Sequence, residues 1–150
     1  MKVELILGIM AIAVFTIACS GRRPSNLGAV GVKLNPCPAS PNCVSSQAPV
    51  DDREHYIEPF AYASSVEEAK ERLVKAINAM KRSKIITDKE DYIHAEYTSA
   101  LFRFVDDVEF IFDDAKKVIH VRSASRLGYG DMGVNRKRVE ELRALFNKRF

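Results

Sequence analysis

The chain has 150 residues, of which 47% are hydrophobic, and its 23 Lys and Arg against 20 Asp and Glu give a formal charge of +3. This length predicts one small domain, and the composition excludes a bundle of membrane helices. The mild positive charge comes without interleaved basic and aromatic residues, so nucleic acid is not an expected partner.

The N-terminus has the pattern of a leader. The segment Leu5 to Ala18 is an uncharged apolar run that follows Lys2 and Glu4. Because it is shorter than the roughly 20 residues that a bilayer-spanning helix needs, it predicts a signal peptide over residues 1–18. An ordinary secretory signal and an uncleaved anchor helix are the alternatives.

The leader ends in Thr16-Ile17-Ala18-Cys19, which resembles the lipobox of bacterial lipoproteins, although leucine is usual at the position of Thr16. The resemblance implies that Cys19 becomes the new N-terminus and carries acyl chains, such as palmitate, on its thiol and its amine. Several chains give stable anchoring. We therefore expect a lipoprotein of the bacterial cell envelope, attached to a membrane and facing the periplasm or the exterior.

Residues 19–54 are expected to form the lipid anchor and an extended tether, because five of the six prolines lie between residues 20 and 50. With Cys19 lipidated, Cys37 and Cys43 remain as a pair. An oxidising compartment favours a disulfide between them, and its short loop predicts a local clip that contributes about 2 kcal/mol. A metal site is the alternative, but no further Cys or His lies at a usual ligand spacing.

The folded domain is expected over residues 55–150, with a short strand at Tyr56 to Phe60. Ser65 and Glu68 form the pattern of a capping box, and apolar residues recur at helical spacing behind it, which predicts a helix from Val66 to Arg82. The apolar positions of this helix are Val66, Ala69, Leu73, Ala76, Ile77 and Met80.

Four strands and a second helix follow. The strands are expected at Lys84 to Thr87, Tyr92 to Thr98, Leu101 to Phe112 and Lys117 to Arg126. Short Asp-rich turns favour antiparallel pairing. The last helix opens near Asn135, and its apolar stripe is Val139, Leu142, Leu145 and Phe146. The pattern predicts an α+β fold, an antiparallel β-meander of about four to five strands with two helices packed on one face.

The turn at Asp113-Asp114-Ala115-Lys116 is expected to pair Phe112 with Lys117. The inner face then carries Phe102, Phe104, Val108, Phe110 and Phe112. The outer face is expected to be an exposed charge ladder that pairs Glu109 with His120, Asp107 with Arg122, Arg103 with Arg126 and Glu96 with Arg103. Glu109 beside His120 has the residue types of a general base, but exposed cross-strand ion pairs are the simpler interpretation. His55 and His94 are expected to face solvent.

Asp106 interrupts the inner apolar face, opposite Ser123 and near Ser125 in this register. A carboxylate on an apolar layer needs a partner, for which Arg126, Arg136 and Arg138 are the candidates. A β-bulge at Asp106-Asp107 that turns both acids outward is the alternative.

Three glycines, Gly128, Gly130 and Gly133, have the spacing of a dinucleotide-binding loop. No second parallel strand can follow before Phe150, and Asp131 would repel a pyrophosphate, so no cofactor is expected. The loop leads instead into a helix whose first turn, Arg136-Lys137-Arg138, is cationic, which requires compensating negative charge.

This strand–helix corner is the candidate site. An anion is expected to contact four residues: Arg126, Tyr129, Asn135 and Arg136. A supporting polar network is expected from Asp106, Arg122, Ser123, Ser125, Asp131 and Arg138. The ligand would be an anionic small molecule, a lipid headgroup or an acidic protein partner. The alternatives are a purely structural Arg–Asp network, a hydrolase or transferase with Asp106 as base, and a carrier of apolar ligands.

Two long patterns carry a family resemblance. The stretch NPCPASPNCVSSQ, residues 35–47, and the stretch VIHVRSASRLGYGDMGVNRKRVEELR near the C-terminus resemble the domain-of-unknown-function 1499 (DUF1499) family. The resemblance covers about Leu34 to Phe146. It implies bacterial proteins that often carry signal or lipoprotein leaders, and it supplies no catalytic residues.

Overall fold

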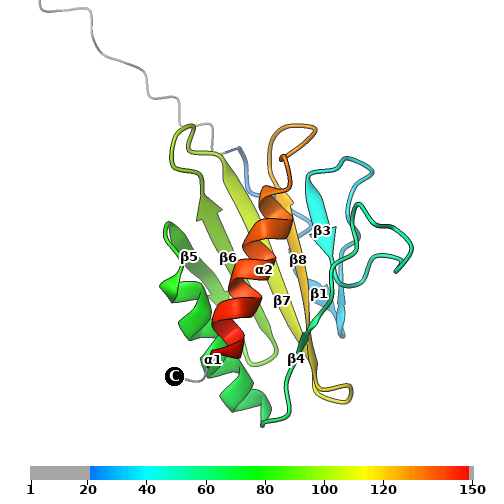
Figure 1. The fold of residues 1–150 in the computed structure, drawn as a ribbon, viewed down its shortest axis with the longest axis vertical. Coiled ribbons are helices and arrows are strands. Elements are labelled where there is room, and N and C mark those ends of the chain that lie inside the picture. The colour runs from blue at the N-terminus through cyan, green and yellow to red at the C-terminus, as the bar shows by residue number, and fades with distance from the viewer. Residues whose placement is uncertain (1–20, 149–150) are drawn as a thin grey trace, which may run out of the picture.

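The computed structural model describes residues 21–148 (Figure 1). A small hairpin comes first, made of β1 (Ala29–Val30) and β2 (Lys33–Leu34). The main sheet contains β3 (Cys43–Ser45), β4 (Phe60–Ala61), β5 (Ser83–Asp88), β6 (Tyr92–Thr98), β7 (Val105–Asp113) and β8 (Val118–Ser125). The helices are α1 (Val66–Ala79) and α2 (Val134–Asn147).

The main sheet is antiparallel, with the strand order β3-β8-β7-β6-β5 and with β4 paired to β8. Strands β5 to β8 are consecutive neighbours, so they form the expected meander, and α1 and α2 cover one face of it (Figure 1). The α+β prediction is confirmed. The core between helices and sheet buries Phe60, Leu73, Ile77, Ile93, Val108, Phe110, Ile119, Val121, Leu142 and Phe146.

Helix α1 begins as its sequence predicts, because the Ser65 side chain accepts the backbone N–H of Glu68 at 3.2 Å. It ends at Ala79 and not at Arg82. Met80 is extended, and Arg82 has a positive φ of 59°, which a continuing helix cannot accommodate. The chain turns here directly into β5.

The register between β7 and β8 differs from the expected one by two residues. Asp113 pairs with Val118 and Phe112 with Ile119, because Asp113 accepts the backbone N–H of Lys116 within the turn and so ends the strand one residue later. A two-residue change keeps every side chain on its expected face but changes its partner. Glu109 therefore lies opposite Arg122 and not His120.

The segment expected to open the third meander strand is a loop. Strand β7 begins at Val105 and not at Leu101, and Arg103 has a positive φ of 58°. Ser99 closes the loop, since its hydroxyl accepts the N–H of Phe104 at 2.9 Å and its own N–H donates to the Phe104 carbonyl at 2.8 Å. Phe102 and Phe104 are consequently exposed and do not join the inner face, and neither Glu96 nor Arg126 faces Arg103 in the ladder.

The folded domain also begins before His55, inside the expected tether. Strand β3 pairs with β8 from Cys43 opposite Ala124 to Ser45 opposite Arg122, and Val44 is buried in the core. Cys43 is disulfide-bonded to Cys37 with an S–S distance of 2.05 Å, as predicted. A three-residue strand is too short to show a hydrophobic period, which is why the sequence does not distinguish it from a linker.

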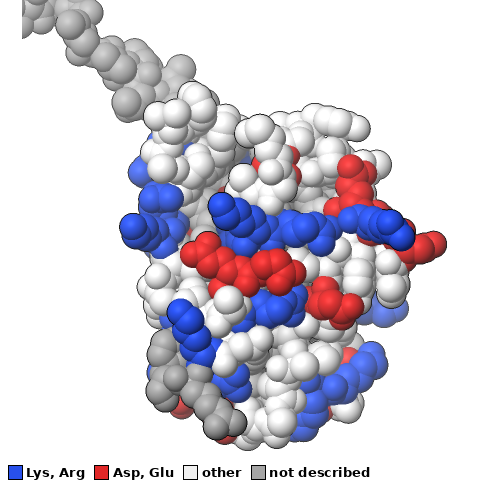
Figure 2. Space-filling view, viewed as in Figure 1, with Lys and Arg blue, Asp and Glu red and all other residues white. Residues whose placement is uncertain are grey.

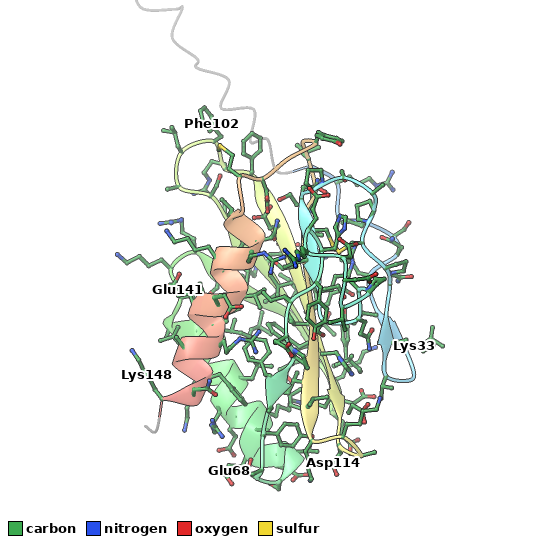
Figure 3. All side chains as sticks on the ribbon, turned by 45° about the vertical axis from the view of Figure 1, so that its right-hand side comes forward. Lys33, Glu68, Phe102, Asp114, Glu141 and Lys148 are labelled. Carbon is green, nitrogen blue, oxygen red and sulfur yellow. A yellow bond between two sulfur atoms is a disulfide. The ribbon has the colours of Figure 1, made fainter. Side chains whose placement is uncertain are left out.

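The second face of the sheet is covered by the segment that precedes β3. Leu34 and Ala29 of the β1–β2 hairpin pack on Tyr92 and Ile111. The hairpin therefore lies across the sheet from the helices, and in Figure 3 Lys33 lies on the opposite side of the domain from Glu141 and Lys148. Both faces of β7 are thus buried, and the expected exposed ladder is wrong in this respect.

The leader, Cys19 and the predicted lipidation lie outside the described residues. Within residues 21–148 the structure contains no helix with the length and apolar character needed to cross a bilayer.

Candidate functional site

The corner between β8 and α2 contains a closed polar network on the helix side of the sheet. Asp106 forms an ion pair with Arg138, whose guanidinium also donates to the Asn135 side chain at 2.7 Å. Asn135 is fully buried and binds the hydroxyls of Ser123 and Ser125. The regular pairing of β7 with β8 shows no bulge at Asp106. Arg138 is therefore the partner that this inward carboxylate requires.

Asp131 occupies the position that an anion would take at the start of α2. One carboxylate oxygen accepts the backbone N–H of Gly133 at 2.9 Å, and the other accepts that of Asn135 at 2.8 Å. These N–H groups are among those that a helix start leaves free for a ligand. The protein's own acid thus satisfies the helix N-terminus.

A second network lies on the opposite face of the sheet, around Arg126. Its Nε donates to Asp107 at 2.7 Å and its Nη2 to the other Asp107 oxygen at 2.8 Å, while Nη2 also pairs with Glu96. The side chains of Arg126 and Asp107 are only 6% and 1% exposed. Arg23, from the N-terminal segment, adds a second cation to Glu96 at 2.6 Å.

Glu109 is the most enclosed acid of this face, with no exposed surface. It accepts hydrogen bonds from Arg122 at 3.1 Å, from the Tyr92 hydroxyl at 2.8 Å and from the backbone N–H of Gly28 at 2.7 Å. Burial and the adjacent Glu109 raise the pKa of Tyr92, so the phenol keeps its proton and donates it. Backbone from the N-terminal segment is thus part of the charge compensation.

His94 completes the outer network and is 3% exposed, contrary to the expected solvent-facing position. Its Nε2 lies 2.8 Å from Asp107, and His94, Glu96 and Asp107 offer ligand atoms within 4.8 Å of one another. The Arg126 guanidinium already binds both carboxylates, however. A metal ion would have to displace this cation, so the cluster does not fit a metal.

The four residues predicted to contact an anion do not converge. Arg126 belongs to the outer network and Asn135 to the inner one. Arg136 donates to the backbone carbonyls of Arg53 and Glu54, and Tyr129 is 77% exposed in the loop. Among the predicted supporting residues, Arg122 also lies on the outer face. The geometry of the corner fits the structural alternative, in which each arginine has an internal acid or carbonyl.

Another candidate for ligand binding is a cavity of about 840 Å³ beside the Cys37–Cys43 disulfide. Its walls come from residues 33–39, from residues 45–55 and from the β7–β8 turn with the start of β8. The titratable and hydroxyl side chains in this wall are Lys33, Ser45, Ser46, Asp52, Glu54, His55, Lys116 and His120. Sequence reasoning missed this site because its residues come from three separated segments.

The two histidines of the cavity have different environments. Nδ1 of His55 binds Asp52 at 2.8 Å, which raises the pKa of His55 although burial opposes the change. Burial lowers the pKa of His120, whose nearest acid, Asp113, is 3.8 Å away. One imidazole is therefore biased toward its charged form and the other toward its neutral form.

His120 also contacts a hydroxyl. Its Nδ1 lies 3.2 Å from Oγ of Ser46, and a neutral imidazole can accept the hydroxyl proton there. The Ser46 oxygen in turn accepts the N–H of Val121 at 2.9 Å, and the residue is 8% exposed. This pair has the residue types of a nucleophile and its base, without an acid in hydrogen-bond range of the imidazole.

The profile of a family described as "Protein of unknown function (DUF1499)" matches residues 33–146, most of the chain. The chain belongs to the DUF1499 family. No curated protein matches it. In this DUF1499 domain, the stretch at residues 35–47 that carried the resemblance forms the disulfide side of the cavity, and the C-terminal stretch forms the inner polar network.

Replacing Arg126 tests whether the corner is structural. In the DUF1499 domain, Arg126→Met leaves Asp107 and Glu96 without their shared cation, and breaking a buried pair in this way costs about 3–5 kcal/mol of unfolding free energy. The matched variant Arg136→Met removes a guanidinium that binds only exposed backbone carbonyls, at a cost of about 1 kcal/mol. Urea unfolding monitored by circular dichroism measures both.

The same samples test the anion hypothesis. We expect sulfate to stabilise wild type and Arg136→Met equally when ionic strength is matched with sodium chloride. A sulfate-specific stabilisation of the wild-type protein that Arg136→Met abolishes would contradict the structural account and support an anion site.

The histidines give a second prediction, on pH. An NMR titration should place the pKa of His55 above its ordinary value of 6.5 and that of His120 below it. Because the folded pKa of His55 is raised and that of Asp52 is lowered, their pair stabilises the fold most between about pH 4 and 6.5. This contribution is lost as the pH rises through the folded pKa of His55. Asp52→Asn should return His55 toward 6.5, and an unchanged His55 titration would exclude the pair.

Proposed function

We propose that the chain is a lipid-anchored module of the bacterial cell envelope that binds a small polar ligand without catalysing a reaction. The anchor is Cys19, and the binding site is the cavity beside the Cys37–Cys43 disulfide. The observation that carries the binding role is this cavity, because the arginines of the strand–helix corner are already paired within the protein.

The composition of the cavity wall supports a ligand with an anionic group. Lys33, Lys116 and His55 line the cavity, and Asp52 biases His55 toward its charged form. The wall also contains Glu54, and Lys116 is paired with Asp113 at 3.1 Å, so Lys33 and His55 are the cations available to an anionic group. Leu34, Pro36 and Pro38 supply apolar surface between them. Ligand sites commonly combine apolar walls with a few polar groups of this kind.

The envelope location is supported by two features of the sequence. An apolar leader precedes Cys19 in the pattern of a lipobox, and a disulfide persists in oxidising compartments such as the bacterial periplasm. The short disulfide loop also forms one wall of the cavity, so the redox state of the compartment bears directly on the proposed site.

An enzymatic role is the second candidate, and the Ser46–His120 contact favours it more than Asp106 does. Asp106 is 6% exposed and paired with Arg138, which leaves it unsuited to act as a base. Ser46 faces a solvent-accessible cavity beside a neutral imidazole. Reaction of Ser46 with a fluorophosphonate probe, detected by peptide mass spectrometry and absent in Ser46→Ala, would contradict a purely binding role.

Blocking the cavity tests the binding role. Ala48→Trp places a large side chain in the wall, whereas Ala144→Trp adds the same group to the exposed side of α2, which contributes no residue to the cavity. After dialysis against the small-molecule fraction of an envelope extract, native mass spectrometry should show a bound molecule on the wild type and on Ala144→Trp only. Equal retention by Ala48→Trp, or no retention by any form, would overturn this assignment of the site.

A further inference from the structure

One end of the domain is unusually apolar. Ten large hydrophobic side chains are exposed among residues 21–148, and seven of them lie on the β6–β7 loop or between β8 and the first residue of α2. We call these seven the apolar end: Leu101, Phe102, Phe104, Leu127, Tyr129, Met132 and Val134. Met132 is 100% exposed and Leu101 is 78% exposed. Exposed apolar clusters of this kind mark interaction surfaces.

The two loops form one continuous surface. A hollow of about 540 Å³ lies between them, and six members of the apolar end line it from both sides. In Figure 1 both loops project beyond the same end of the sheet, and in Figure 3 Phe102 is at the tip. The surface is therefore a compact tip made of two loops. A projecting tip suits insertion into a lipid bilayer more than docking against a flat protein surface.

Basic residues flank one side of the apolar end. Lys81, Arg82 and Lys137 line the adjacent hollow together with Val134, and Arg103 lies within the β6–β7 loop itself. In Figure 2 this end is mostly white, with Lys and Arg atoms just below it. An apolar tip flanked by basic residues matches a bilayer, where apolar side chains enter the acyl boundary and cations meet anionic headgroups.

The position of Gly21, where the described chain begins, indicates what the apolar end binds. A Cβ atom on Gly21 would lie 3.1 Å from Cγ of Leu127, so the N-terminal segment leaves the domain at the apolar end. Cys19 is only two residues earlier, and an extended chain spans at most about 3.3–3.6 Å per residue. The backbone of Cys19 is therefore limited to within about 7 Å of the Gly21 backbone, so the point of lipid attachment is close to this surface.

We propose that the apolar end docks on the lipid bilayer, with the side chains of the β6–β7 and β8–α2 loops inserted at the headgroup–acyl boundary. The inference rests on the anchor at Cys19 from the proposed function. It adds an orientation, in which the apolar end of the domain faces the membrane. The disulfide cavity, formed by other segments on the side of the sheet, remains open to solvent.

The absence of tryptophan from the sequence allows a direct test. Phe102→Trp places a single fluorophore at the tip, and Val50→Trp places one at a position that is 74% exposed and outside the apolar end. The full-length protein is coupled through Cys19, its one cysteine outside the disulfide, to a maleimide lipid in vesicles of phosphatidylcholine with or without phosphatidylglycerol. This coupling makes tethering independent of whether cells acylate Cys19.

We expect lipids brominated on their acyl chains to quench the tryptophan at position 102 and to leave that at position 50 unchanged. Without coupling, phosphatidylglycerol should strengthen partitioning about fivefold for each basic residue that reaches the surface. Equal quenching at the two positions would overturn the docking proposal. Loss of quenching with formation of a dimer in solution would also overturn it and would assign the surface to a second copy.

A separate measurement tests the lipid anchor at Cys19. Intact mass spectrometry of the protein isolated from bacterial membranes should show acyl chains on Cys19. If it does not, the lipoprotein assignment is wrong, whereas the quenching result still decides whether the tip enters a bilayer.

Discussion

The bidentate pairing of Arg126 with Asp107 is the interaction on which the arrangement of this domain depends. It places a cation at the centre of a sheet face that carries the acids Glu96, Asp107 and Glu109. Burying such groups is costly unless each is paired and hydrogen-bonded. The N-terminal segment completes the pairing, through Arg23 on Glu96 and the N–H of Gly28 on Glu109, and at the same time excludes water from the face.

This requirement explains why the chain before β3 is part of the domain. The segment that supplies Arg23 and Gly28 continues into the hairpin and the disulfide loop, and so it also forms one wall of the cavity. At its other end it leaves the domain beside Leu127, at the apolar end. The charge compensation, the proposed ligand site and the proposed membrane orientation therefore all depend on where one segment crosses the sheet.

Local patterns predicted the parts of the fold that depend on neighbouring residues. The Ser65 cap, the meander and the disulfide follow from short-range chemistry, and the faces of β7 and β8 follow from alternation. Partners across the sheet could not be predicted, because the turn closes at Asp113 and not at Phe112, and a two-residue shift leaves the hydrophobic pattern unchanged. The sequence predicted that arginines of the corner pair with acids, but it did not separate them by face. Arg122 and Arg126 pair with acids on the face opposite Arg138. Three residues of β3 carry too little pattern to reveal the strand that brings Ser46 to His120.

The central claim is that the buried acids of the outer face are fully compensated, and the pKa of Asp107 tests it most directly. Burial alone would raise this pKa, but the hydrogen bonds from Arg126 and His94 outweigh burial and lower it. A carbon-13 NMR titration of the Asp107 carboxyl in the folded protein should therefore give a pKa below the ordinary value of 3.8. A pKa above that value would show an uncompensated buried acid and would contradict the account.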